Sequence, residues 1–332
     1  MPAPERSGQN LPLEDTDIVV VVVNWNTREL LRQCLDSLRE CRESLRLSIV
    51  VVDNGSTDGS ADMIEAAYPE TRLVKNSTNM GFAKANNVVF GLYPACSYFL
   101  LLNSDATVTP EVIGILLRFL KAHEGVAAVG PALRLPDGRF QMGGAGWGPR
   151  ASYSFNTFFL LSRMNRRFRG LFIVQEHYEG RHEPVDVDWL AGACMMIRAK
   201  TLAQVGFFDE RYFVYGEDAE WCWRARAKGW RFAYLPQVFA THHYRGSMIE
   251  SGSMRAEWFD LLADAVCRSS SALNYRSFLL FGVMGYALRV VGLAPLSIGR
   301  KRSSVRDRIA NYRSLLGESI RLLFRTGKAC NK

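Results

Sequence analysis

The stretch Asp17-Ile-Val-Val-Val-Val-Val23, followed directly by Asn24-Trp25-Asn26, decides the fold of this 332-residue chain. An uninterrupted run of β-branched residues is typical of a strand that is buried on both faces in the parallel sheet of an α/β protein. Residues 27–41 continue with Leu and Cys at helical spacing behind Thr27, a favourable N-cap residue. The N-terminal segment therefore predicts the strand and the helix of a βα unit.

The same alternation continues along the chain. Further strands are predicted at 47–52, 71–74, 98–102, 126–129, 185–189, 193–198 and 231–235, and further helices at 60–67, 82–90, 110–122, 200–205 and 217–228. Alternating units of this kind predict an α/β fold with a doubly wound, mostly parallel sheet flanked by helices. Residues 1–16 read as a flexible leader, residues 17–248 as the α/β domain, and residues 249–332 as a C-terminal helical extension without strand signals.

Composition and charge exclude several classes of protein. With 48% apolar and 22% charged residues the chain is globular, not disordered or fibrous. Its seven cysteines are scattered and never spaced C-x-x-C, so neither a disulfide framework nor a zinc knuckle is expected. The net charge is +8, but residues 276–332 carry twelve Lys and Arg against two acids, a net charge of +10. Such a basic tail predicts an anionic partner, either lipid headgroups or nucleic acid.

Polar residues follow the predicted strands at the edge where α/β sheets bind their ligands. Asp53 ends one strand, and its carboxylate could accept hydrogen bonds from a base or a ribose, or could instead form an Asx turn. Asn103 and Asp105 end another strand. Asp105 could hold Mg²⁺ or Mn²⁺ on a diphosphate, or could be a helix N-terminal acid before Pro110.

Two later segments carry reactive groups. Glu217 and Asp218 open a helix, where an acid is either a cap or a general base at the edge of a cleft. Trp221 and Trp223 on that helix could form a platform for an acceptor or pack in the core. The pair His242-His243 could supply a metal ligand or a phosphate contact, or be structural.

Six segments in this order resemble the family 2 glycosyltransferases, most strongly their bacterial rhamnosyltransferase-like branch. They are VVVVNWNTRELLRQCLDSL, VVDNGSTDGS, NMGFAKANN, LLNSDATVTP, WLAGACMMIRAKTLAQVGFFDERYFVYGEDAEWCWRARAKGW and HHYRGS, within residues 17–247. Each motif alone is weak, but six in order are specific. The resemblance implies a GT-A fold, a nucleotide-diphosphate sugar donor, a divalent metal (Mg²⁺ or Mn²⁺) and inversion at the anomeric carbon. It divides the domain into a nucleotide-binding half (17–130) and an acceptor half (131–248).

The resemblance also implies roles for individual residues. It assigns the nucleotide sugar to Asn24, Trp25, Asn26, Asp53, Asn79, Gly81, Lys84, Asn87, Asn103, Ser104 and Asp105. Asp105 and His242 are the implied metal ligands, with His243 left open as the alternative to His242. Asn103 departs from the family pattern, because many members have Asp there. Asp218 matches the catalytic base, with Glu217 as the fallback, and Trp189, Gly192 and Trp221 are expected on the acceptor side.

The function expected from this resemblance is inverting transfer of a sugar to a hydroxyl of a lipid-linked or cell-surface glycan. The first candidate donor is dTDP-rhamnose, with UDP-sugars as the alternative. A non-catalytic sugar-nucleotide-binding or glycan-binding protein of the same fold is the rival interpretation. Nucleic acid is not an expected partner, because no zinc finger, helix-turn-helix or RNA-binding signature accompanies the basic tail.

The extension contains an apolar stretch at 278–298, interrupted by Arg289 and Pro295. It could span a membrane, lie in the interface as an amphipathic helix, or pack on the α/β domain. With the Arg-rich residues 300–325 beside it, the interfacial arrangement on anionic lipid is favoured. The expected location is therefore cytoplasmic, at the cytoplasmic face of a bacterial inner membrane.

Overall fold

A computed structural model describes residues 18–148, 151–159, 178, 181–243, 256–297 and 303–324. The predicted leader at 1–16 lies outside these residues, as do Ser247 and the last eight residues of the basic tail. The strands in chain order are β1 (Ile18–Asn24), β2 (Leu47–Asp53), β3 (Arg72–Lys75), β4 (Tyr98–Asn103), β5 (Ala106–Thr107), β6 (Val126–Arg134), β7 (Ala145–Gly146), β8 (Val185–Val187), β9 (Trp189–Leu190), β10 (Cys194–Arg198) and β11 (Arg231–His242).

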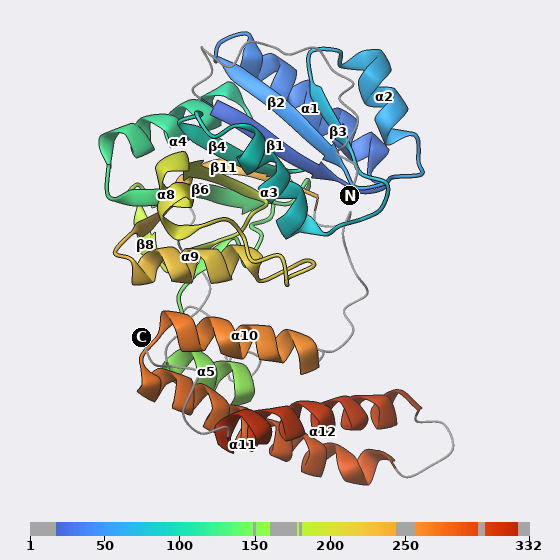
Figure 1. Cartoon of the computed structure of the whole chain (residues 1–332), viewed down its shortest axis with the longest axis vertical. Coiled ribbons are helices and arrows are strands. Elements are labelled where there is room, and N and C mark those ends of the chain that lie inside the picture. Colours follow the sequence, from blue (N-terminus) through green and yellow to red (C-terminus); the bar gives the residue numbers. More distant parts are fainter. Residues whose placement is uncertain are drawn as a thin grey trace.

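Seven helices precede the C-terminal extension in the part of the chain that the structure describes. They are α1 (Arg28–Arg42), α2 (Ser60–Ala67), α3 (Phe82–Leu92), α4 (Pro110–Ala122), α5 (Ala151–Phe159), α8 (Ala199–Val205) and α9 (Glu217–Ala227). The extension contributes α10 (Ala256–Ser269), α11 (Ala272–Leu293), the 3₁₀ turn η3 (Ala294–Ser297) and α12 (Ser303–Phe324). In Figure 1, α5, α10, α11 and α12 form a helical layer beside α9, below the sheet.

The main sheet has the order β3-β2-β1-β4-β10-β6-β11-β5, with β8 also paired to β11. Strands β3, β2, β1 and β4 are parallel to one another, and β6 is parallel to β11. Strand β10 runs antiparallel between β4 and β6. The predicted fold, a mostly parallel sheet flanked by helices, is thus confirmed, and the antiparallel pairings of β10, β5 and β8 make the sheet mixed.

The β-branched run of β1 fills both sides of the sheet. Ile18, Val20 and Val22 pack in the cluster that includes α1, α2 and α4. Val19 and Val21 pack in the cluster that includes α3, α8 and α9. Because successive side chains of a strand point to opposite faces, a strand covered by helices on both sides needs apolar residues at every position.

Four elements differ from the sequence-based prediction. Strand β11 continues beyond residue 235 to His242, through an irregularity between Leu235 and Phe239 that contains Pro236. The two-residue strands β5 and β7 and the helix α5 were not predicted. The extra length of β11 matters for function, because it carries His242 back across β5, where it pairs with Ala106.

The helical extension packs against the α/β domain on its inner side. Phe158 of α5, Trp223 of α9, Phe259 of α10 and Phe278 of α11 belong to one hydrophobic cluster. At Gly285 of α11 the backbone passes so close to Phe158 that an added Cβ would lie 2.5 Å from its carbonyl oxygen. The sequence left three arrangements open for the apolar stretch at 278–298, and this close approach corresponds to the third, packing within the protein.

The cysteines are mostly buried thiols. Cys34, Cys41, Cys96, Cys194 and Cys222 are free. Cys267 of α10 is disulfide-bonded, which the sequence analysis did not expect.

Candidate active site

A cavity of about 420 Å³ opens at the carboxyl end of the parallel strands. It brings together many of the residues singled out in the sequence. Those that line it are Trp25, Asn79, Gly81, Asn103, Ser104, Asp105, Trp189, Gly192, Glu217, Asp218 and His242.

One wall of the cavity carries an Asp–His–Asn cluster. The His242 Nε2 atom lies 3.0 Å from Asp105 Oδ1 and 3.2 Å from Asn103 Nδ2. On the other side of the ring, His242 Nδ1 lies 2.9 Å from Gln141 Oε1, so both ring nitrogens have polar partners. His243 points elsewhere, and its backbone N–H donates to the carbonyl of Asp105. Of the two histidines, His242 is therefore the one that reaches this cluster.

A buried hydrogen-bond network supports the cavity from below. Asn24 Nδ2 donates to Asp53 Oδ1 at 2.8 Å, and the Ser56 backbone N–H donates to Asp53 Oδ2 at 3.0 Å. Neither Asn24 nor Asp53 is among the lining residues. The hydroxyl of Thr27 donates to Asn24 instead of capping α1, and Asp58 accepts from the first N–H of that helix. Asp53 therefore makes the contacts of an Asx turn, the second of the two roles considered for it in the sequence.

A second polar group lies where residues 17–130 meet residues 131–248. Asn54 Nδ2 contacts Asn79 Oδ1 and the Gly81 carbonyl, both at 3.3 Å. Gly81 has a φ of +84°, and an added Cβ would overlap the carbonyl oxygen of Phe213. Only glycine fits this close approach.

The acidic pair Glu217-Asp218 stands at the start of α9, facing the cavity. Asp218 accepts from the Gly192 backbone N–H at 2.9 Å and from the Ala219 N–H at 2.7 Å. Glu217 is only 4% exposed, and its Oε2 atom has no hydrogen-bond partner. Burial, followed by the neighbouring Asp218 charge, raises the pKa of Glu217, and burial also raises the pKa of Asp218 against its two N–H donors.

This difference in hydrogen bonding separates the two carboxyls. N–H donors stabilise a carboxylate, and burial without enough of them favours the protonated form. Backbone hydrogen bonds from Tyr215 and Glu217 lower the pKa of Glu217 only in part, because its Oε2 atom has no donor. Asp218 is therefore the member of the pair that ionises first, and Glu217 is the one that stays protonated. An ionised Asp218 beside a neutral neighbour can accept a proton from a bound hydroxyl.

Besides Asn24 and Asp53, four predicted site residues lie outside the cavity lining. Lys84 is exposed on α3, and Asn26 uses its side chain to accept from the Thr57 N–H. Asn87 binds the backbone of Phe208 through both of its amide atoms. Trp221 is fully buried between Phe208 and Phe232, so it has no free face for an acceptor.

Other cavity residues were missed in the sequence. They include Asn54, Gln141, Met142, Tyr212, Phe213, Tyr215 and Leu262. The sequence suggested Trp221 and Trp223 as a possible platform for an acceptor, and of the two only Trp223 is among the residues that line the cavity. Only Tyr215 left a signal, because it stands directly before the Gly-Glu-Asp turn into α9. Leu262 belongs to α10, so the extension forms part of the wall.

The cavity offers a limited set of metal ligands. Within the described residues, no group of three or more His, Cys, Asp or Glu side chains converges on one point. Asp105 and His242 form a pair of hard ligands, to which an oxygen-rich anionic ligand would have to add.

Comparisons with known proteins found a family profile and related sequences that match this chain. The profile of the glycosyltransferase-like family 2 matches residues 16–259. The chain is 30% identical over 244 residues to the N-acetylglucosaminyl-diphospho-decaprenol L-rhamnosyltransferase of Mycobacterium tuberculosis, covering 69% of this chain and 76% of the relative.

Solved structures show the same fold at low sequence identity. A crystal structure of GalNAc-T7 with UDP, GalNAc and Mn²⁺ superposes with a TM-score of 0.58 at 14% identity, covering 89% of this chain and 54% of that one. TarS of S. aureus, residues 1–349, superposes with a TM-score of 0.54 at 14% identity, covering 93% and 83%. The GT-A fold expected from the sequence is confirmed.

The raised pKa of Glu217 predicts how stability depends on pH. A carboxyl whose pKa is raised by folding destabilises the folded state once the pH exceeds its unfolded pKa, and more so until the folded pKa is passed. Glu217→Gln removes this effect. Burial raises the pKa of Glu217 from 4.5 to about 8, so the stability gained by the variant over the wild type should grow from about pH 4.5 to about pH 8, measured by urea unfolding.

Glu220→Gln is the matched control on the same helix. It removes the ion pair with Arg224, in which Arg224 Nη2 lies 2.8 Å from Glu220 Oε2, so it should destabilise the protein. A Glu217→Gln advantage that stays constant over this pH range would mean that the Glu217 carboxyl is ionised in the folded protein.

Proposed function

The chain belongs to glycosyltransferase family 2 and is a glycosyltransferase, and from that premise we propose that it is an inverting enzyme that moves L-rhamnose from dTDP-rhamnose to a hydroxyl of a lipid-linked glycan. One observation carries the proposal. The candidate base Asp218 and the Asp105–His242 pair line the same cavity, so an acceptor hydroxyl and a leaving diphosphate have room in one chamber.

The choice of donor and acceptor is supported by the related protein from M. tuberculosis. Its name specifies an L-rhamnosyl group and an acceptor on decaprenyl diphosphate. UDP-sugars remain the alternative donor class. The aromatic side chains of Trp189, Phe213 and Tyr215 in the cavity wall suit stacking against the apolar faces of a sugar acceptor.

In the proposed reaction, Asp218 acts as a base and not as a nucleophile. The N–H groups of Gly192 and Ala219 hold its carboxylate in one orientation. It takes the proton of the acceptor hydroxyl while that oxygen attacks the anomeric carbon on the face opposite the diphosphate. A single displacement of this kind inverts the anomeric configuration. Glu217, kept neutral, avoids placing a second negative charge beside the base.

We also propose that Mg²⁺ or Mn²⁺ binds between Asp105 and His242. The residues fit a cation, because a buried carboxylate and an imidazole nitrogen meet at the cavity wall. Asn103 adds an amide within reach. A bound divalent ion would neutralise charge on the leaving diphosphate. With the ion bound, His242 Nδ1 would donate to Gln141 Oε1, which lies 2.9 Å away, and Nε2 would be the ligand.

The proposed base predicts a specific loss of turnover. Asp218→Asn should lower kcat by about 10²–10⁴-fold with donor affinity nearly unchanged, because only the proton acceptor is removed. The assay presents a panel of nucleotide sugars that includes dTDP-rhamnose, with a polyprenyl-diphosphate glycan as acceptor, and reads the anomeric configuration by NMR. Glu217→Gln, which removes no base in this scheme, should retain much more activity. Wild-type turnover in Asp218→Asn, or a retained configuration, would refute the mechanism.

The proposed metal site predicts a chelator-sensitive enzyme. Activity should be lost in excess chelator and return with Mg²⁺ or Mn²⁺, and Asp105→Asn or His242→Gln should weaken Mn²⁺ binding measured by electron paramagnetic resonance in the presence of the nucleotide diphosphate. Asp218→Asn is the control and should bind Mn²⁺ as the wild type does. Full activity in chelator would exclude the metal from the reaction.

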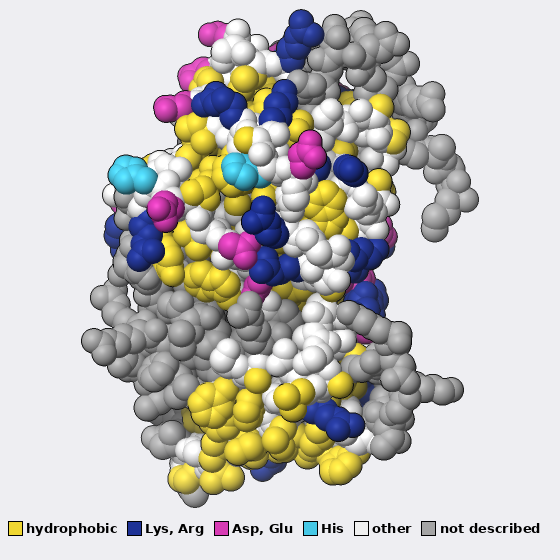
Figure 2. Space-filling view, turned by 90° about the vertical axis from the view of Figure 1, so that its left-hand side faces the viewer, with side chains coloured by type: hydrophobic (Ala, Val, Ile, Leu, Met, Phe, Trp, Pro, Cys, Tyr) yellow, Lys and Arg dark blue, Asp and Glu magenta, His cyan; other side chains and the backbone are white. Residues whose placement is uncertain are grey.

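We further propose that the outer face of α11 docks on an anionic membrane surface. Among the described helices, α11 alone is long and apolar enough to span a bilayer by length and composition. Its exposed face carries Leu273, Leu280, Met284, Leu288 and Val291 at helical spacing. Figure 2 shows hydrophobic side chains gathered at the lower end of the molecule, where the helical extension lies. Arg276 and the exposed Arg306, Arg308 and Arg313 of α12 supply positive charge beside this face.

An interfacial position follows from the two faces of α11. Its inner residues Phe278, Gly282 and Tyr286 are buried in the protein, so the helix is free to meet lipid only on its outer side. Each Lys or Arg near an anionic surface adds about 1 kcal/mol to binding. The proposal puts the protein at the cytoplasmic face of the inner membrane, next to a lipid-linked acceptor.

The membrane proposal predicts binding to anionic vesicles. The full-length protein should sediment with vesicles that contain phosphatidylglycerol and not with purely zwitterionic ones, and high salt should release most of it. Met284→Glu combined with Leu288→Glu should abolish binding without changing the circular dichroism. Leu92→Glu, an exposed apolar position on α3, is the control and should bind normally. Unchanged binding of the α11 variant would exclude this face.

A further inference from the structure

One wall of the cavity is an irregular loop that enters α9. Residues 206–216 connect α8 to α9, and Tyr212, Phe213 and Tyr215 of this loop line the cavity. Phe213 and Tyr215 are each 50% exposed, so their rings are available to a ligand. The loop ends directly before Glu217 and Asp218, so its path also fixes where the proposed base stands.

The loop is held in a conformation that it would not adopt alone. Tyr215 has a φ of +66°, in the left-handed region that costs a residue with a Cβ about 1 kcal/mol or more. On the nucleotide-binding side, the loop is fastened by the Phe82 N–H, which donates to the Phe213 carbonyl at 2.8 Å. Asn87 fastens it a second time through the backbone of Phe208.

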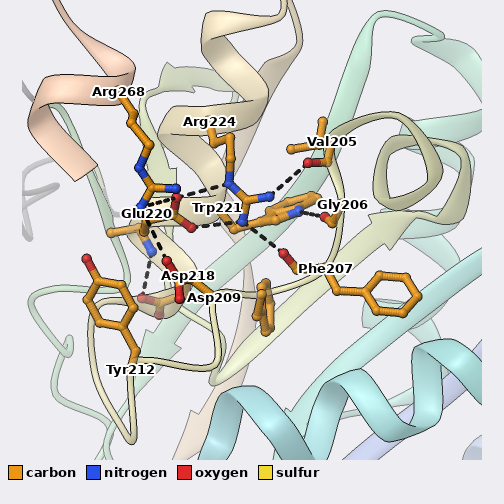
Figure 3. Close-up of polar contacts among 12 residues, drawn as sticks. Val205, Gly206, Phe207, Asp209, Tyr212, Asp218, Glu220, Trp221, Arg224 and Arg268 are labelled. Atoms are coloured by element: carbon orange, nitrogen blue, oxygen red, sulfur yellow. Dashed lines mark hydrogen bonds and ion pairs between the residues drawn. The ribbon is translucent and has the colours of Figure 1, made fainter. Parts of the chain in front are cut away.

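On the opposite side, the loop is fastened to the helical extension by Arg268 of α10. One guanidinium nitrogen, Arg268 Nη2, lies 3.2 Å from Asp209 of the loop, 3.6 Å from Glu220 of α9 and 2.9 Å from Asp264 of α10. Arg268 thus joins three elements at one point, as Figure 3 shows.

Two further residues complete this connection. Arg211 of the loop contacts both Asp209 and Asp264, and the hydroxyl of Tyr212 donates to the Leu261 carbonyl of α10 at 2.9 Å. Arg224 closes the cluster by binding Glu220 and the carbonyls of Val205 and Phe207.

The cluster is balanced in charge and partly buried. Three carboxylates (Asp209, Glu220, Asp264) face three guanidinium groups (Arg211, Arg224, Arg268). The side chain of Glu220 is 1% exposed and that of Asp209 is 14% exposed. Burial alone would raise the pKa of Asp209, but hydrogen bonds from Arg211 and Arg268 lower it to about 2. Loss of one cation would leave a buried carboxylate without its partner, which costs more than an exposed ion pair gains.

We propose that Arg268, which belongs to the extension, is a positioning residue for the acceptor. By binding Asp209 and Glu220, it fixes the position of residues 206–216, which form one wall of the cavity. The role in acceptor binding rests on the proposed function. Arg268 itself is not among the residues that line the cavity, so it acts through the loop. On the donor side, Phe82 and Asn87 hold the loop through their own hydrogen bonds. Loss of Arg268 should therefore weaken binding of the acceptor and not of the donor.

The test compares Arg268→Met with Arg321→Met. Arg321 is the matched control, because it joins Asp260 of α10 to Glu318 of α12 in the same helical layer without contacting the loop. Arg268→Met should lower kcat/KM for the acceptor about tenfold, equivalent to about 1.4 kcal/mol, mainly through KM, with the donor dissociation constant unchanged. Arg268→Lys keeps the charge and should recover part of the loss. Arg321→Met should leave all of these constants near wild type.

Amide hydrogen exchange supplies a readout that does not depend on activity. Exchange at residues 209–216 should become faster in Arg268→Met and stay unchanged in Arg321→Met. Equal effects of the two substitutions, or a loss that falls on donor affinity, would overturn the inference. Should Arg268→Met not fold, the same comparison with Arg268→Lys decides it. A wild-type protein that transfers no sugar would refute the proposed function, and the exchange comparison would still test Arg268.

Discussion

Parallel pairing of β1 with β2 on one side and β4 on the other is the constraint on which the remaining structure depends. Asn24 pairs with Asp53, and Val23 pairs with Asn103, so three polar strand ends meet at one edge. The Ile and Val run does not set its own register, since every position is apolar. The buried hydrogen bond between Asn24 and Asp53 fixes the register of β1 against β2, because a shift of one strand by one residue would leave these buried polar groups unpaired.

The same register explains what the sequence could predict. Long β-branched runs and well-spaced helices were predictable, as were the polar residues at the strand ends, because both follow from local periodicity. The two-residue strands β5 and β7 are too short to have a period. The continuation of β11 beyond Pro236 could not be predicted from the sequence, because a proline argues against a continuing strand.

Residues that reach the cavity by tertiary packing could not be read from the chain. Gln141 approaches His242 from a position 101 residues earlier, and Leu262 arrives with α10. Trp221 and Trp223 illustrate the limit within one helix. Two residues apart, they point to different sides of α9, and the sequence does not say which side meets the core. The structure buries Trp221 and turns Trp223 toward the cavity.

Trp223 is also the point at which the extension becomes part of the site. It lines the cavity and belongs to the cluster of Phe158, Phe259 and Phe278. One hydrophobic cluster therefore contains residues from both sides of the position, residue 248, at which the sequence divides the α/β domain from the extension. A spanning α11 would have to expose Phe278, Leu279 and Tyr286 to lipid and leave their partners unpacked. The partners left behind, Phe158, Trp223 and Phe259, would lose their cover, and each such side chain contributes about 1.5–3 kcal/mol when it is buried away from water. Tyr286 would also lose its ring contacts with Phe158 and Phe259. Docking by the outer face alone keeps this cluster intact, and with it the wall that Trp223 and Leu262 give to the cavity. The physical cost of unpacking thus favours an enzyme that rests on the membrane over one that is threaded through it.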